Sequence, residues 1–161
     1  MTRYCLRQKW LAFGDDFAVE DEHGREAFFV DGHAFAWGDK LSVQAPRGRE
    51  VAFVAQKLLA WGPTYELTRG GRPIAVVRKE LFTLFRCRFT VDVPGPYDLE
   101  AVGDFLDHEY ELLRDGRTVV RVSKAWFSWT DTYGVEVAPG EDDLLAVCVA
   151  IVIDLCCHGP R

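Results

Sequence analysis

Four lysines and one histidine occupy equivalent positions in a repeated pattern of short segments, and they are the strongest candidates for chemistry in this sequence. These positions are Lys9, His33, Lys57, Lys79 and Lys124. Equivalent positions of successive strands are expected at one end of a sheet or barrel. Clustered cationic groups bind phosphate or carboxylate. The pattern predicts an anion site, for example for a phospholipid headgroup; the alternative is that these side chains only solvate strand ends.

The spacing within the repeat limits this prediction. An arginine precedes each of four slots, by eight residues for His33 and Lys57 but by seven for Lys79 and Lys124. Successive residues of a strand face opposite sides, so a shift of one residue reverses the facing unless a bulge intervenes. The five side chains therefore form one ring only if some strands carry bulges.

Carboxylates and thiols offer weaker candidates for catalysis or metal binding. Asp107, His108 and Glu109 are consecutive, so in a strand His108 faces away from the two carboxylates, unlike a convergent site. We find no nucleophile motif and no phosphate loop followed by a helix. Five cysteines without paired spacing indicate free thiols in a reducing compartment. We therefore expect no enzyme activity, no metal and no cofactor.

Composition narrows the class of partner. The 161 residues carry a formal net charge of −6, and 48% of them are hydrophobic. An acidic globular chain is a poor candidate for general nucleic-acid binding. The first residues lack the apolar run of a signal peptide. These features predict a cytoplasmic protein, with contact to a membrane only at its periphery.

The elements that position these residues follow from a repeat of glycine turns. Glycines recur at intervals of 21 to 24 residues, and a second turn signal falls midway between them. The repeated glycines are Gly24, Gly48, Gly71, Gly95, Gly116 and Gly140. Glycine supplies the positive φ of tight hairpin turns. We predict about twelve antiparallel strands over residues 4–138, arranged as either a sandwich or a closed barrel.

Residues 142–157 are predicted to form one helix that is apolar on every side. Such a helix must be surrounded by protein or lipid. Fourteen apolar residues span roughly 21 Å, less than the ~30 Å hydrocarbon core of a bilayer. A helix inside a barrel fits best; a buried strand pair and lipid insertion are alternatives. Asp154 interrupts the apolar run, and we expect it to pair with a lysine or arginine.

Several motifs together give the chain a resemblance to the LURP-one-related proteins of the Tubby-like superfamily, which also contains the phospholipid scramblases. The matching residues include Phe13-Gly14-Asp15-Asp16-Phe17, Val30-Asp31-Gly32, Gly38-Asp39-Lys40-Leu41, Asp107-His108-Glu109-Tyr110-Glu111 and Ser123-Lys124-Ala125-Trp126-Phe127-Ser128-Trp129. The resemblance covers the whole chain and implies a single domain, 1–161, in which a twelve-stranded closed barrel encloses a central helix. Trp126 and Trp129 are predicted to be structural.

The resemblance also suggests classes of function. Tubby-like relatives bind phosphoinositides, scramblases move lipids, and plant members are linked to pathogen defence. We predict a non-enzymatic module that recognises a phospholipid headgroup or another anionic ligand at the barrel rim. One alternative is a protein-interaction or stress-related scaffold, and a second is an enzyme that uses the carboxylates. A barrel filled by its own helix cannot hold a ligand centrally, so any site is expected on the rim or outer surface.

Overall fold

The computed structural model describes residues 1–9, 16–35, 38–57, 62–83, 86–126 and 132–158, which form twelve strands and one helix. The strands are β1 (Thr2–Lys9), β2 (Asp16–Asp21), β3 (Glu26–Phe35), β4 (Gly38–Gln44), β5 (Glu50–Gln56), β6 (Thr64–Arg69), β7 (Arg72–Thr83), β8 (Arg86–Asp92), β9 (Leu99–Asp104), β10 (Glu109–Arg114), β11 (Arg117–Ser123) and β12 (Thr132–Val137). The helix α1 spans Asp143–His158.

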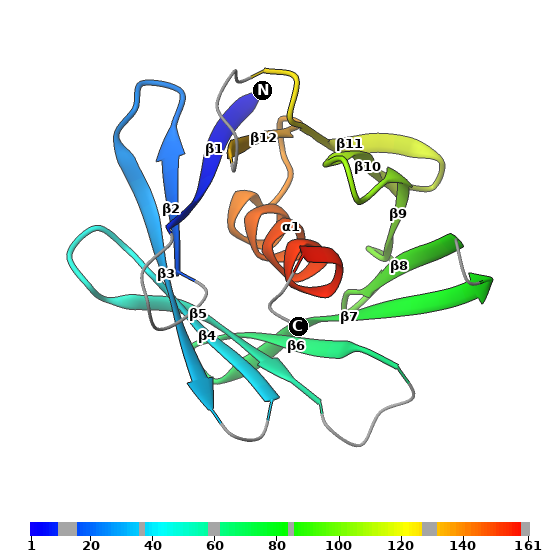
Figure 1. Cartoon of the computed structure of the whole chain (residues 1–161), viewed down its shortest axis with the longest axis horizontal. Coiled ribbons are helices and arrows are strands. Elements are labelled where there is room, and N and C mark those ends of the chain that lie inside the picture. Colours follow the sequence, from blue (N-terminus) through cyan, green and yellow to red (C-terminus); the bar gives the residue numbers. More distant parts are fainter. Residues whose placement is uncertain (10–15, 36–37, 58–61, 84–85, 127–131, 159–161) are drawn as a thin grey trace.

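The strands form a closed antiparallel barrel. Each strand pairs with its neighbours in sequence, and β1 pairs with β12 to complete the circle. Figure 1 shows α1 in the middle of this ring of strands. The closed twelve-stranded barrel with a central helix is thereby confirmed, and closure removes the exposed strand edges that an open sheet would present.

The repeated glycines lie in the turns that lead from each even-numbered strand to the next odd-numbered one. Gly24, Gly48, Gly71, Gly95 and Gly116 therefore occupy one end of the barrel, which we call the glycine end. Each has a positive φ, as at Gly116, where φ is +76°. Gly140 lies between β12 and α1, so the helix begins at the glycine end and runs towards the opposite end.

Packing of the helix against the wall forms the core. Residues of α1 from Val147 to Ile153 are at most 1% exposed, and inward side chains of the strands surround them. The largest buried strand side chains include Leu6, Phe17, Leu41, Leu67, Phe89 and Leu112. The helix of 16 residues is about 24 Å long. Within the described residues, no helix combines the length and the hydropathy that membrane crossing requires.

Polar side chains of the wall fasten the start of the helix. The carboxylate of Asp142 accepts a hydrogen bond from the backbone N–H of Leu145, which caps the helix N-terminus. Three residues of the wall bind acidic side chains at or just before the start of the helix. Tyr4 binds Asp143 at 2.6 Å, Arg69 binds Asp142 at 3.0 Å and Arg114 binds Glu141 at 2.5 Å. Contacts from β1, β6 and β10 thus fix where the helix enters the barrel.

Candidate functional site

The predicted anion-binding residues all belong to odd-numbered strands or follow one. Because every odd-numbered strand runs away from the glycine end, these positions lie towards the opposite end. Lys57 and Lys124 directly follow β5 and β11, and Lys79 lies within β7. The backbone of Lys9 pairs with Asp16 and that of His33 with Lys40. The side chains of Lys9 and His33 lie outside the described part of the structure.

Two of the lysines face opposite sides of the barrel wall. Lys57 lies outside, with its Nζ 3.2 Å from the Glu66 carboxylate. Lys79 lies inside, where its Nζ donates a hydrogen bond of 3.4 Å to the carbonyl of Cys156 in the last turn of α1. A cation at a helix C-terminus also interacts favourably with the helix dipole. The structure does not bring these two amines together, in keeping with the uneven spacing of the repeat.

Lys124 is exposed, and its backbone is held by Glu109. One carboxylate oxygen of Glu109 accepts hydrogen bonds from the Ser123 hydroxyl at 2.8 Å and from the backbone N–H groups of Lys124 and Ala125 at 3.0 and 3.2 Å. Glu109 therefore anchors the segment that leads to Trp126. Sequence reasoning missed this role, because Glu109 and Ser123 become neighbours only through the pairing of β10 with β11.

Asp154 is buried in the barrel and pairs with His108, so the expected lysine or arginine partner is wrong. Its Oδ1 lies 2.6 Å from Nε2 of His108, and the side chains are 5% and 14% exposed. His108 occupies the turn between β9 and β10 with φ of +53°. That turn directs the imidazole to the helix, where it stacks on Tyr133 at 4.4 Å between ring centroids. Loop conformation, rather than strand alternation, supplies the partner.

Two tyrosines complete this buried polar cluster. Tyr110 and Tyr133 are buried, and within the described residues their hydroxyls have no hydrogen-bond partner. Burial raises the pKa of both hydroxyls well above the usual value of 10, and the charge of Asp154 raises it further. The cluster is enclosed by the wall, which suits a structural role at the end of the helix.

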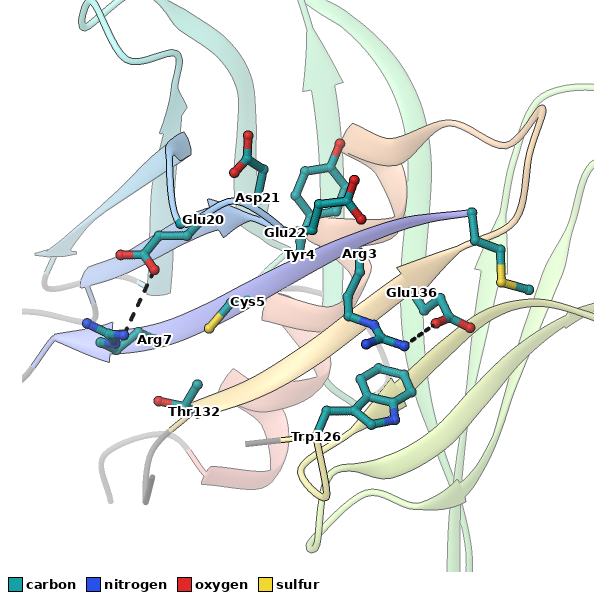
Figure 2. A pocket seen from close by; sticks show the side chains of 12 residues that line it. Arg3, Tyr4, Cys5, Arg7, Glu20, Asp21, Glu22, Trp126, Thr132 and Glu136 are labelled. Atoms are coloured by element: carbon teal, nitrogen blue, oxygen red, sulfur yellow. Dashed lines mark hydrogen bonds and ion pairs between the residues drawn. The ribbon is translucent and has the colours of Figure 1, made fainter. Parts of the chain in front are cut away.

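A hollow of about 640 Å³ lies on the outer wall over β1, β2 and β12 (Figure 2). Trp126 forms one side, and the guanidinium of Arg3 lies 4.5 Å from the centre of its ring. Arg3 also binds Glu136 of β12 at 2.7 Å. In the middle, Cys5 of β1 pairs with Gly134 of β12.

The side of the hollow opposite Trp126 carries polar side chains. Arg7 lies 3.9 Å from the Glu20 carboxylate. Thr132 lines the hollow and is 3% exposed as a residue. Burial, and then the charge of Glu20, raises the pKa of the Cys5 thiol. A thiol that stays protonated is a weak nucleophile.

The remaining predictions concern the two tryptophans and metal binding. Trp126, expected to be structural, lines the hollow and contacts Arg3, whereas Trp129 lies outside the described residues. No group of three His, Cys, Asp or Glu side chains in the described ranges could hold a metal ion. The hollow itself was not predicted, because its residues come from positions 1–24 and 126–136 and meet only through barrel closure.

Comparison with known proteins identifies the family of this chain. Residues 2–154 match the family described as LURP-one-related. The chain belongs to the LURP-one-related family. It is 33% identical over 156 residues to YxjI of Bacillus subtilis, an uncharacterized protein, covering 96% of this chain and 93% of YxjI. An X-ray structure of an Arabidopsis thaliana protein, AT5G01750, has a TM-score of 0.66 at 15% identity and covers 95% and 91% of the two chains. That likeness shows the same fold.

The His108–Asp154 pair of this LURP-one-related barrel gives a first prediction. Removing one partner of a buried hydrogen bond leaves the other partner unsatisfied and costs about 1–3 kcal/mol, whereas replacing both by apolar groups costs far less. We expect His108→Ala to lower the free energy of unfolding by that amount and the double variant His108→Leu/Asp154→Leu to recover most of it. Urea unfolding measures both. Equal losses in the single and double variants would contradict an energetically coupled pair.

The buried tyrosines predict how stability responds to alkaline pH. Below pH 10 both are neutral in the folded and unfolded chain, so they add no pH dependence. Above pH 10 the unfolded chain loses protons that the folded chain retains, which favours unfolding by about 1.4 kcal/mol per pH unit and tyrosine. Tyr133→Phe should therefore lose less stability than the parent between pH 9 and pH 11 in urea unfolding.

Tyr97 provides the control for this measurement, because its side chain is 54% exposed. Tyr97→Phe is expected to lose as much stability as the parent chain over the same pH interval. If Tyr133→Phe behaved like Tyr97→Phe, ionisation of Tyr133 would not contribute to alkaline unfolding.

Proposed function

We propose that this LURP-one-related chain is a non-catalytic binding module that docks a protein partner in the outer hollow over β1, β2 and β12. The observation that carries the proposal is the wall formed by Trp126 and Arg3, in which Cζ of Arg3 lies 4.5 Å from the centre of the Trp126 ring. Tryptophan and arginine are the residue types that most often dominate the binding energy of protein interfaces. The helix fills the barrel interior, so an outer site suits this fold better than a central one.

The surroundings of the hollow support a preformed site. Its floor is the hydrogen-bonded wall of a closed barrel, and Glu109 holds the backbone of Lys124 and Ala125 just before Trp126. Arg3 is held in turn by Glu136. A site whose side chains are already ordered loses little conformational entropy when a partner binds. Rigid support of this kind favours binding without a large rearrangement.

Recognition of an anionic headgroup at the end opposite the glycine end is a second candidate function. Lys124 is exposed there, and Leu106, in the turn between β9 and β10, is 68% exposed. Apolar and cationic side chains at one end of a protein are the combination that peripheral membrane contact uses. The thiols of Cys5 and Cys148 are free, which fits the cytoplasmic location that this proposal includes.

Peptide selection tests the protein-docking proposal. Peptides selected from a display library on the immobilised chain should bind the hollow. We expect Trp126→Ala to weaken the selected peptides by at least about tenfold, the usual effect of losing a dominant interface residue. Tyr97→Ala removes an exposed aromatic side chain elsewhere and should leave affinity unchanged, with circular dichroism confirming that both variants fold. Equal affinity for parent and Trp126→Ala would overturn the proposal.

Vesicle sedimentation tests the headgroup proposal. At low salt, the chain should sediment with phosphatidylcholine vesicles that contain phosphatidylinositol phosphate and remain in solution with phosphatidylcholine alone. The variant Lys124→Glu/Leu106→Ser should lose this binding, because it reverses the charge and removes the apolar contact. Arg47→Glu places the same charge reversal in the exposed turn between β4 and β5, at the glycine end, and should bind normally. Absence of binding by the parent chain at low salt would refute the proposal.

A further inference from the structure

We propose that the helix inside the barrel positions Trp126 on the outer wall, through contacts of Asp154, His108 and Glu109. Asp154 and His108 are then positioning residues for the outer hollow, although neither residue lines it. The inference rests on the docking function proposed above and adds what holds the docking side chain in place. Its basis is a continuous series of contacts that leads from α1 to the segment before Trp126.

The first contact joins the helix to the turn between β9 and β10. Oδ1 of Asp154 lies 2.6 Å from Nε2 of His108. The His108 ring also stacks on the ring of Tyr133, with 4.4 Å between the ring centroids. The turn that carries His108 is thus held by α1 and by β12 at the same time.

The second step is a covalent one, from His108 to Glu109. The two residues are adjacent, and the peptide unit that joins them is planar and rigid. The backbone of β9 also lies very close: a Cβ at Gly103 would be 2.6 Å from the carbonyl oxygen of Glu109 and 2.7 Å from the Cα of Tyr110. Such close backbone packing resists displacement of Glu109 relative to β9. The turn and the start of β10 therefore move as one unit.

The third contact joins Glu109 to the segment that carries Trp126. One carboxylate oxygen of Glu109 accepts hydrogen bonds from the backbone N–H groups of Lys124 and Ala125, at 3.0 and 3.2 Å. The Ser123 hydroxyl donates to the same oxygen at 2.8 Å and accepts a hydrogen bond from the backbone N–H of Ala125 at 3.1 Å. Hydrogen bonds to a charged acceptor are stronger than neutral ones. Trp126 directly follows this anchored backbone.

The two side chains of the β9–β10 hairpin that begin and end this link lie on different sides of the wall. His108 contacts the buried Asp154, whereas Glu109 is exposed and contacts the connection after β11. A change at the end of α1 therefore reaches the outer surface through two consecutive residues. Loss of either the inner or the outer hydrogen bonds should displace Trp126, and substitutions that retain a hydrogen-bond acceptor should not.

Fluorine NMR of the full chain labelled with fluorotryptophan tests the inference without a ligand. The chain has five tryptophans, and Trp126→Phe assigns the signal of Trp126. Asp154→Ala and Glu109→Ala should each shift this signal by more than its line width. Asp154→Asn and Glu109→Gln keep an oxygen that can accept the same hydrogen bonds and should leave the signal in place. A signal that stays in place in both alanine variants would overturn the inference.

Leu67→Ala is the control for a general loss of stability. Leu67 is fully buried in β6, on the opposite side of the barrel from β12. Truncating a buried leucine leaves a cavity and destabilises the fold strongly. The Trp126 signal should nevertheless stay in place, with circular dichroism confirming that the variant is folded. If Leu67→Ala shifted the signal as far as Asp154→Ala does, loss of stability would explain both shifts and the inference would be wrong.

Peptide binding separates this inference from the docking function. Peptides selected from a display library on the parent chain should bind Asp154→Ala at least about fivefold more weakly, the lower end of the usual coupling between two sites. They should bind Asp154→Asn as tightly as the parent. If Trp126→Ala weakened these peptides and Asp154→Ala did not, the docking function would stand and the positioning role would fail. If Asp154→Ala shifted the Trp126 signal but Trp126→Ala left peptide binding unchanged, the positioning role would stand and the docking function would fail.

Discussion

Burial of α1 is the constraint on which the rest of this structure depends. The helix is apolar on all sides, so no face of it tolerates water, and only a wall that surrounds it completely can bury it. An antiparallel barrel closed between β1 and β12 is such a wall. The two parts need each other, because the inward side chains of the strands would otherwise line an empty space.

The polar groups at the two ends of the helix are handled differently. At the glycine end, Tyr4, Arg69 and Arg114 bind acidic residues near the barrel edge. At the opposite end, Lys79 binds a carbonyl of the last turn, and Asp154 is buried against His108. The contacts at the glycine end are partly solvated, whereas Asp154 at the opposite end is only 5% exposed. Because Asp154 is buried, its contact with His108 favours one position of the helix along the barrel axis. A helix shifted along that axis would leave a buried carboxyl group without a partner.

A filled interior leaves the outside of the barrel for the recognition that we propose. The outer hollow combines a rigid floor with Trp126, which is carried by a connection that Glu109 anchors. The same wall thus buries the helix on its inner face and forms the floor of the hollow on its outer face. Strand alternation makes this possible, since neighbouring residues of β1 such as Cys5 and Leu6 face the hollow and the core respectively.

The sequence by itself determined the elements, while tertiary structure decided their contacts. Glycine spacing predicted the hairpins, and the apolar run predicted the helix within one residue at each end, because both are local properties. Closure into a barrel came from family resemblance. The partner of Asp154 lies 46 residues away in a turn of unusual backbone conformation, and Thr132 reaches the hollow only because β12 pairs with β1. Such contacts depend on register and loop geometry, which residue types and spacing do not encode locally.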